Sequence, residues 1–253
     1  MVNYSNKKAV ITGGTTGIGL GVARALVERG AEVLVTGRSE ASLEAARREL
    51  GARAHVVRAD SGSMSDLELL GGEVERRLGV VDLVHLNVGY CKIEPFVEVT
   101  EASYDLTFAT NTKAVFFGVK WLAPLVRDGG AFVFTTSVAD ELGYPGMSTY
   151  SGSKEAIRGF ARVFAAELLP RKIRVNAVSP GFVRTPTMGI HGASAEEILA
   201  FQREGDALTP MGRNGTVEEI AAAVLFLGFE ATFTTGQELV VDGGMTRIVR
   251  PHS

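Results

Sequence analysis

Three side chains in the middle of the chain have the types and spacing of a proton-transfer site. Tyr150 and Lys154 lie four residues apart at the start of a predicted helix, so their side chains leave one helix face. At about 4 Å and an effective dielectric near 20, an ammonium stabilises a phenolate by about 4 kcal/mol before desolvation is subtracted. Lys154 is therefore expected to lower the pKa of Tyr150 toward neutrality, while Ser137, after a predicted strand, can orient a carbonyl oxygen. For Tyr150 and Lys154 taken alone, a solvated helix face is the better interpretation.

A glycine-rich turn near the amino terminus has the composition of a phosphate-binding loop. Four glycines lie within residues 13–19, between a predicted strand at 9–12 and a predicted helix at 18–29. Without side chains in the turn, the backbone N–H groups and the positive end of the helix can face a pyrophosphate. A tight connection alone would need about one glycine. We therefore interpret the turn as a dinucleotide site.

The end of the second predicted strand indicates which dinucleotide is bound. A carboxylate about 20 residues beyond the glycine turn accepts hydrogen bonds from both ribose hydroxyls of NAD. Gly37 stands near this position, and Arg38 and Ser39 follow with a guanidinium fork and a hydroxyl that suit a 2′-phosphate. NADP(H) is the expected cofactor and NAD(H) the less favoured one. The alternative is that Arg38 is a solvated residue before the next helix.

Short β-branched runs alternate with helical stretches, which predicts one α/β domain over residues 1–253. Most strands are continuous apolar runs, as in parallel strands covered on both faces. Right-handed crossovers give a doubly wound, seven-stranded parallel sheet with helices on both faces and a ligand site beyond its carboxyl ends. Strands are predicted at 9–12, 32–36, 54–59, 81–87, 131–136, 174–179 and 238–241. Helices are predicted at 18–29, 40–50, 65–78, 103–126, 150–169 and 217–227, with a short one at 195–203.

Residues 185–214 interrupt this alternation and are rich in glycine, proline and methionine. Long insertions of this kind often close over a ligand, so the segment is predicted to be a substrate lid. Met188 and His191 within it are candidates to face the substrate.

Composition excludes several classes of protein. With 26 basic and 29 acidic residues, no excess of positive charge is available to hold nucleic acid. The single cysteine, Cys91, cannot form an internal disulfide. The longest apolar run, 220–229, has half the roughly 20 residues that a membrane-spanning helix needs. The four histidines have no metal-ligand spacing, so no metal is expected, and a cytoplasmic location follows from the lack of an apolar signal region.

The tyrosine, the lysine and the glycine turn belong to a longer series of motifs. The series is T-G-x-x-x-G-I-G at 12–19, N-x-G at 87–89, Asn111, Ser137 thirteen positions before Tyr150 of Y-x-x-x-K, P-G-x-x-x-T at 180–185, T-G-Q at 235–237 and V-D-G-G at 241–244. In this combination and order, over nearly its whole length, the chain resembles the classical short-chain dehydrogenase/reductase (SDR) family, which has the Rossmann fold.

The resemblance implies roles for four catalytic residues. Tyr150 would be the general acid in reduction and the general base in oxidation. Lys154 would lower the pKa of Tyr150 and bind the nicotinamide ribose, and Ser137 would hold the substrate oxygen. Asn111 resembles the family asparagine that holds a water in the proton relay to the lysine.

The resemblance also implies the contacts of the cofactor. Asp60 would meet the adenine amino group, Asn87 and Gly89 the adenosine side, and Val183 and Thr185 the carboxamide and the phosphates. Ser61 and Leu86 depart from the residues common in the family, which weakens the detail of cofactor binding more than that of catalysis. The expected cofactor-binding residues are Gly13, Thr15, Thr16, Gly17, Ile18, Gly19, Arg38, Ser39, Asp60, Asn87, Gly89, Tyr150, Lys154, Pro180, Gly181, Val183 and Thr185.

These inferences predict an NADPH-dependent carbonyl reductase, reversible as a secondary-alcohol dehydrogenase, that acts on a small or medium carbonyl substrate as a homotetramer. A reductase of 3-ketoacyl groups on acyl carrier protein would use the same residues and remains an alternative. From a different class, a non-catalytic dinucleotide-sensing module is a second alternative. The intact Ser137, Tyr150 and Lys154 argue against the sensor, because it needs no proton donor.

Overall fold

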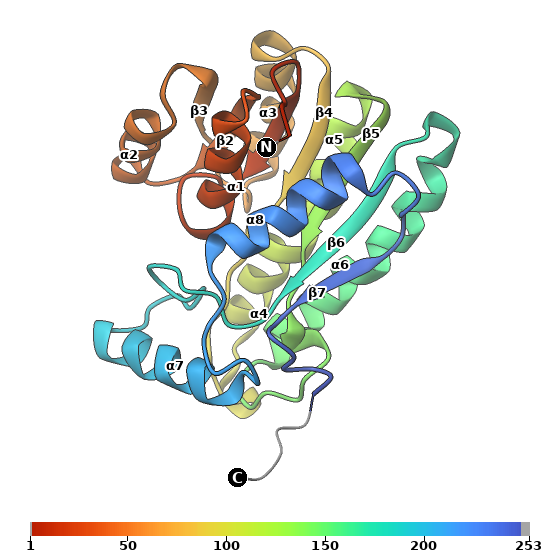
Figure 1. The fold of residues 1–253 in the computed structure, drawn as a ribbon. Coiled ribbons are helices and arrows are strands. Elements are labelled where there is room, and N and C mark those ends of the chain that lie inside the picture. The colour runs from red at the N-terminus through yellow and green to blue at the C-terminus, as the bar shows by residue number, and fades with distance from the viewer. Residues whose placement is uncertain (1, 249–253) are drawn as a thin grey trace.

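Seven parallel strands form one sheet in the order β3-β2-β1-β4-β5-β6-β7 (Figure 1). The computed structural model describes residues 2–248. The sheet confirms the predicted doubly wound, seven-stranded fold. The strands are β1 (Lys8–Thr12), β2 (Glu32–Gly37), β3 (Ala54–Arg58), β4 (Val81–Leu86), β5 (Val126–Thr135), β6 (Arg174–Pro180) and β7 (Glu238–Val241).

Helices cover both faces of the sheet, as the continuous apolar strands predicted. Alternate side chains of one strand enter opposite cores: Ile11 joins the core under α1, α2 and α8, whereas Val10 joins the core under α3, α5 and α6. Figure 1 shows α7 beyond the layered body of the domain. The helices are α1 (Gly17–Glu28), α2 (Glu40–Leu50), α3 (Met64–Arg77), α4 (Glu101–Phe108), α5 (Ala114–Leu122), α6 (Ser148–Glu167), α7 (Ala195–Leu208) and α8 (Val217–Leu225).

The helix predicted at 103–126 is wrong as a single element. It consists of α4, a π-helical turn at Ala109–Lys113, α5 and a 3-10 turn at Ala123–Leu125. Pro124 ends α5, because a proline ring clashes with the preceding turn of a helix and lacks an N–H donor. The π turn contains Asn111, and such turns are frequent at functional sites.

The remaining differences lie at the ends of elements. Strand β5 begins at Val126, but an irregularity follows, and regular pairing with β4 resumes at Ala131, the predicted start. Helix α6 begins two residues earlier than predicted, at Ser148. Helix α7 runs to Leu208 rather than 203, and a capping box between Ser194 and Glu197 fixes its start. Local pattern alone does not resolve such ends.

The strand order reverses between β1 and β4, both of which pair with parallel neighbours. Chain connections leave β1 toward one edge of the sheet and β4 toward the other, which opens a crevice beyond their carboxyl ends. This is the position where the glycine turn, Asn87 and the residues after β5 meet.

Candidate active site

A cavity of about 620 Å³ lies beyond the carboxyl ends of the strands. It extends from the ends of β2 and β3 past the glycine turn to Ser137, Tyr150 and the predicted lid. In the described part of the chain, all but two of the predicted site residues line it, the exceptions being Gly19 and Asn111. The fold thus brings together residues that are far apart in the sequence.

Two kinds of constraint act on the glycine turn. Gly13 and Gly17 have φ of +62° and +54°, a backbone conformation that side chains with a Cβ rarely adopt. Gly19 instead lacks space, since an added Cβ would lie 2.3 Å from the Gly13 oxygen. Gly19 therefore allows α1 to pack against the turn. Thr15 and Thr16, which belong to the turn itself, line the cavity.

The helix starts at the cavity differ from the helix starts elsewhere. Within residues 2–248, no side chain at the N-cap accepts a hydrogen bond from the first turn of α1, α2 or α6. Helices α3, α4, α7 and α8 are each capped by a serine or threonine, whereas α5 has no cap because it continues directly from the π-helical turn. Uncapped N–H groups at a helix start are free to bind an anion, which the helix dipole also favours. The cavity therefore presents the donors that a dinucleotide diphosphate needs.

At the adenosine end, Arg38 lies beside Asp60. The Arg38 Nη1 atom is 3.9 Å from Asp60 Oδ2, and both side chains are about half exposed, at 55% and 45%. The N–H of Gly62 donates to Asp60 Oδ1 (2.9 Å), which fixes the carboxylate. An exposed guanidinium held at such a distance retains its hydrogen-bonding capacity for a phosphate.

Gly37 is constrained by a neighbour that the sequence did not indicate. A Cβ at Gly37 would lie 2.3 Å from Thr15 Oγ1 and 2.7 Å from Thr15 Cγ2. An NAD-type carboxylate at this position would thus collide with the glycine turn unless Thr15 moved. The threonine occupies the space that an acidic side chain would need.

A chain of polar contacts joins β4, β5 and the glycine turn. The Thr135 hydroxyl donates to Asn87 Oδ1 (3.2 Å), and the Asn87 amide donates to the Gly13 carbonyl oxygen (3.4 Å). Because Thr135 donates to Asn87, the fully buried His85 donates its Nε2–H to Thr135 (2.9 Å). Burial lowers the pKa of His85 to about 3, so the ring stays neutral. This chain holds Asn87 at the wall of the cavity.

Ser137 and Tyr150 meet at the opposite end of the cavity. Ser137 begins a 3-10 turn, Val138–Asp140, and its hydroxyl accepts from the Ala139 N–H (3.2 Å). The same side chain is hydrogen-bonded to the Tyr150 phenol. Both hydroxyls therefore reach one point, where a substrate oxygen can bind.

Lys154 is buried beside this pair, with 1% of its surface exposed. Its ammonium donates to the Thr135 carbonyl oxygen (2.8 Å) and lies 5.6 Å from the centre of the Tyr150 ring. Burial lowers the pKa of Lys154 to about 8. A Cβ at Gly89 would lie 3.3 Å from the Lys154 nitrogen, so Gly89 leaves room for the ammonium at the cavity wall.

The expected lowering of the Tyr150 pKa is not found. Burial raises the pKa of Tyr150 well above its ordinary value, and the hydrogen bond with Ser137 opposes this only in part. Desolvation disfavours the phenolate more strongly than the simple charge–charge argument allowed. The phenol is consequently held protonated over the neutral pH range and is suited to donate a proton.

Asn111 acts on the site from outside the cavity wall. Its buried side chain accepts from the Tyr90 N–H (2.7 Å) and donates to the Tyr90 oxygen (3.0 Å) and to Ser153 Oγ (2.9 Å). Ser153 in turn donates to the Tyr150 carbonyl oxygen (2.7 Å). Asn111 therefore fastens the segment after β4 to the start of α6, and its role in a proton relay stays a prediction.

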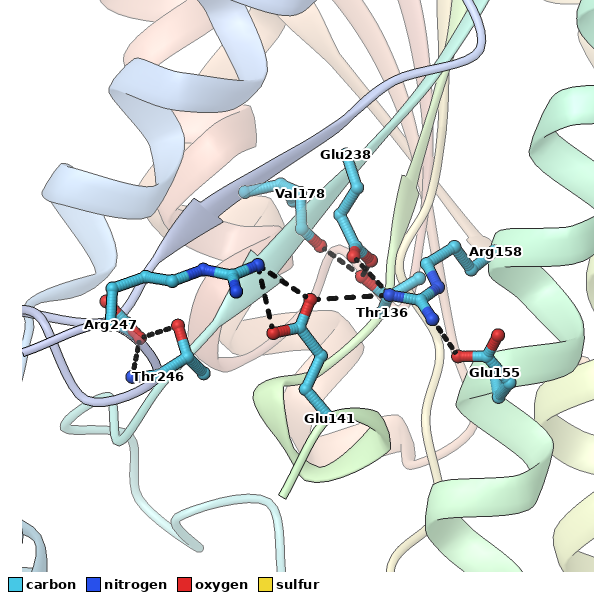
Figure 2. Close-up of polar contacts among 9 residues, drawn as sticks. Thr136, Glu141, Glu155, Arg158, Val178, Glu238, Thr246 and Arg247 are labelled. Atoms are coloured by element: carbon cyan, nitrogen blue, oxygen red, sulfur yellow. Dashed lines mark hydrogen bonds and ion pairs between the residues drawn. The ribbon is translucent and has the colours of Figure 1, made fainter.

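An ionic network that the sequence did not reveal braces the turn after Ser137 (Figure 2). Arg158 contacts Glu141 (3.3 Å), Glu155 (2.7 Å) and Glu238 (3.6 Å). Thr136, next to Ser137, contacts Glu238 Oε1 (2.5 Å) and the Val178 carbonyl oxygen (3.0 Å). Arg158 lies one turn beyond Lys154 on the same helix. The network thus links α6, which carries Tyr150, to the strand end that carries Ser137.

Asp140 lies inside this network without a hydrogen-bond partner for either carboxylate oxygen among the described residues. Burial, and then the nearby Glu238 carboxylate, raises the pKa of Asp140 to about 7, although Arg158 opposes the shift. The charge of Asp140 also acts on Tyr150 and Lys154. A carboxyl group with a pKa near neutrality therefore lies close to Tyr150 and Lys154.

Residues 2–248 contain no helix long and apolar enough to cross a membrane. The same part of the chain brings no three His, Cys, Asp or Glu side chains into an arrangement that could hold a metal ion.

Known proteins match this chain over nearly its whole length. A family described as Enoyl-(Acyl carrier protein) reductase matches residues 13–246. The chain is 34% identical to the oxidoreductase asL5 of Sarocladium schorii, over 96% of this chain and 97% of that protein. It is 34% identical to the L-fucose dehydrogenase of Bos taurus, over 95% of this chain and 90% of that protein. A crystal structure of a dehydrogenase/reductase from Sinorhizobium meliloti 1021 superposes with a TM-score of 0.86 and 33% identity over 96% of each chain.

These matches place the chain in a defined class of protein. It belongs to the short-chain dehydrogenase/reductase family and is an oxidoreductase. The family normally uses nicotinamide dinucleotides, and the uncapped helix starts and glycine turn of this chain fit such a cofactor.

Proposed function

We propose that the protein is an NADPH-dependent carbonyl reductase that also works in reverse as a secondary-alcohol dehydrogenase. The observation that carries this proposal is the arrangement of Ser137, Tyr150 and Lys154 at one end of a cavity whose other end suits a dinucleotide. The reduction of a carbonyl group needs a proton donor and a group that holds the oxygen, and a protonated phenol beside a serine hydroxyl provides both. A dinucleotide sensor would not need it.

The proposed mechanism assigns one task to each residue. The bound nicotinamide supplies the hydride in reduction and accepts it in oxidation. Ser137 donates a hydrogen bond that fixes the substrate oxygen, and Tyr150 gives its proton to that oxygen as negative charge develops there. Lys154 stabilises the resulting phenolate. Its buried ammonium, anchored on the Thr135 carbonyl, is held ready at a fixed distance from the ring.

The preference for NADPH is supported by three features of the adenosine end. Arg38 is exposed enough to bind a phosphate, and Ser39 precedes a helix without a side-chain cap. Thr15 leaves no space for a side chain at Gly37. A 2′-phosphate would thus meet a guanidinium and helix N–H groups, whereas the ribose of NAD would meet no carboxylate at position 37. Asp60 is the acidic neighbour that any adenosine group must accommodate.

A direct assay tests the proposed function. Ketones and secondary alcohols are incubated with NADPH, NADH and their oxidised forms, and nicotinamide absorbance reports turnover. We expect ketone reduction with NADPH to be the fastest reaction near neutral pH, because Tyr150 is protonated there. Turnover only in the presence of acyl carrier protein would instead assign a 3-ketoacyl reductase. Tight dinucleotide binding without turnover of any carbonyl compound would contradict the proposal.

We further propose that residues 185–214 form the substrate lid. Hydrogen bonds tie this segment to the body of the protein, since the His191 N–H donates to the Cys91 oxygen (2.8 Å) and the Met211 N–H to the Gly243 oxygen (3.2 Å). The ring of His191 also packs 4.6 Å from that of Tyr90. Pro186, Thr187, Met188 and Ile190 line the cavity, so the segment is placed to cover a substrate.

A homotetramer in the cytoplasm remains our proposal for the assembly and location. The apolar stretch that suggested an interface, residues 220–229, is mostly buried within the chain itself, where α8 packs on α1. Exposed apolar side chains lie instead on α4, α5 and α6, at Tyr104, Leu106, Phe116 and Val163. Sedimentation at micromolar concentration tests the assembly, and a species of 26.9 kDa alone would reject it.

A further inference from the structure

Apolar and aromatic side chains surround the catalytic tyrosine. Cys91, Ala139 and Met147 form a small buried cluster against which Tyr144, Tyr150 and Phe201 pack. The Phe201 ring lies edge-on to Phe182, with ring centres 4.9 Å apart, and to Tyr144 at 6.4 Å. Leu142, Met188, Ile190 and Met245 complete this part of the lining.

The charged side chains that line the cavity either lie at its adenosine end or are already hydrogen-bonded within the protein. Among the described residues that line the cavity, three carry a charged side chain: Arg38, Asp60 and Lys154. Arg38 and Asp60 stand together at the adenosine end, and the Lys154 ammonium is bonded to the Thr135 carbonyl oxygen. A carboxylate or phosphate of the substrate would find no cation of its own beside Phe201.

The other ionisable side chains that line the cavity near Tyr150 are uncharged at neutral pH. Burial raises the pKa of the Cys91 thiol to about 12, so the thiol stays uncharged. The Tyr144 hydroxyl donates to the Glu204 carboxylate of α7, which leaves the Tyr144 ring to face the cavity. Burial, and then the charge of Arg38, lowers the pKa of His191, so this ring is neutral at neutral pH.

We propose that the substrate is an uncharged carbonyl compound with a ring or other bulky apolar group next to the carbonyl carbon. The inference rests on the proposed function and adds the class of substrate. Its carbonyl oxygen binds Ser137 and Tyr150, and its apolar group packs among Met147, Phe182 and Phe201. Aromatic edge-to-face and sulfur–aromatic contacts favour such a group. Free sugars and anionic ketones are poor substrates, because their hydroxyls and charges would be buried without partners.

A matched pair of ketones tests this class directly. Methyl 4-acetylbenzoate and 4-acetylbenzoate carry the same acetyl group and differ, at the far end of the ring, by one methyl group and one negative charge. We expect NADPH-dependent kcat/KM to be at least about 100-fold lower for the carboxylate, the effect of burying an unpaired charge. Equal values, or a kcat/KM for L-fucose oxidation that exceeds that for 1-phenylethanol, would overturn the inference.

A variant pair locates the effect at the cavity wall. Phe201→Arg places a cation among the apolar residues and should raise the carboxylate-to-ester ratio of kcat/KM at least about 10-fold. Leu199→Arg adds the same charge to the exposed side of α7, where Leu199 is 54% exposed, and should leave the ratio unchanged. If Phe201→Arg does not fold, Leu142→Arg gives the same test from another residue of the lining. An unchanged ratio in a folded wall variant would contradict the inference.

Failure of the proposed function and failure of the proposed substrate class give different results. If neither ester nor carboxylate is reduced, and no other carbonyl compound is, the proposed function is wrong. If the ester and the carboxylate are both reduced at equal rates, the proposed function stands and the class of substrate is wrong.

Discussion

The two ends of the cavity solve different physical problems. At the adenosine end, the side chains of Arg38 and Asp60 are 55% and 45% exposed, and backbone N–H groups of uncapped helices supply the remaining donors. At the reacting end, Lys154 is 1% exposed and the pKa of both Tyr150 and Lys154 is displaced by burial. Binding of a charged cofactor tolerates water, whereas proton transfer needs groups removed from it.

This difference predicts how mutations act at each end. An exposed contact contributes a limited free energy of binding that is independent of its neighbours. Its loss therefore weakens binding only by the free energy of that one contact. A buried catalytic group works only together with the groups that surround it, so its removal abolishes the reaction. The following changes test the contrast, from the largest expected effect to the smallest.

Tyr150→Phe should abolish most turnover. Removing a general acid lowers kcat by about 10²- to 10⁴-fold, while the affinity for NADPH should stay close to that of the parent protein. Single-turnover oxidation of NADPH and a fluorescence titration of binding separate the two quantities. Retention of more than about a tenth of kcat would correspond to less than about 1.4 kcal/mol, too little for a proton donor.

Arg38→Ala should weaken use of NADPH by about 10- to 150-fold, the effect of losing one charge-assisted contact of about 1.5 to 3 kcal/mol. Use of NADH should change little. The measurement is kcat/KM with both cofactors, and Arg47→Ala is the control, since Arg47 lies on α2, pairs with Glu40 and is not among the residues that line the cavity in the described chain. A parent enzyme that already prefers NADH would refute the assignment.

Arg158→Met should lower kcat by about 10-fold, or about 1.4 kcal/mol, without changing the affinity for NADPH. The arginine positions the turn of Ser137 against α6 through Glu141 and Glu238. Glu155→Gln is the control, because Glu155 contacts Arg158 from within α6 itself.

A double variant distinguishes this positioning role from a loss of stability. In the Arg158→Met variant, the Glu238 carboxylate loses its cation. Adding Glu238→Gln removes that charge, so the double variant should lose less stability than the sum of the losses in the two single variants. Its kcat should remain low. Recovery of kcat together with stability would mean that Arg158 only stabilises the fold.

Bound NADPH should slow protease cleavage within residues 185–214 by at least about threefold, because ligand binding shifts the population away from locally opened states. Cleavage sites and rates are followed by mass spectrometry with and without cofactor. The exposed residues 127–129 at the start of β5, which are not among the residues that line the cavity, are the internal reference. Cleavage of the segment at the same rate in both conditions would argue against a lid.

Asp140→Asn should raise stability at high pH and have little effect at low pH. The raised pKa of Asp140, about 7, exceeds the value of about 3.9 for an unfolded aspartate. The folded parent therefore binds the proton more tightly, and its stability falls as pH rises from about 4 to about 7.

The measurement is the melting temperature of both proteins at pH 4.5 and pH 8. We expect the variant to gain about 2–4 °C at pH 8, equal to about 1 kcal/mol for a domain of this size, and almost nothing at pH 4.5. The same gain at both pH values would show that burial of the carboxylate is not the cause.

Sequence patterns determined the sheet, its helices and most of the lining of the cavity. Apolar runs, the glycine turn and the i, i+4 pair of Tyr150 and Lys154 are local signals. The sequence did not predict the π turn at Asn111, because it arises where the asparagine side chain binds Tyr90 and Ser153, which lie on other segments.

Tertiary structure alone decided the electrostatics of the site. The approach of Lys154 to Tyr150 predicted a lowered pKa, but the fold buries the phenol and raises it, since desolvation depends on everything that surrounds a group. The network of Arg158 joins Glu141, Glu155 and Glu238, which lie up to 97 residues apart in the sequence. Local patterns record neither burial nor contacts between distant segments, and burial and such contacts set the charge of each group in the candidate site.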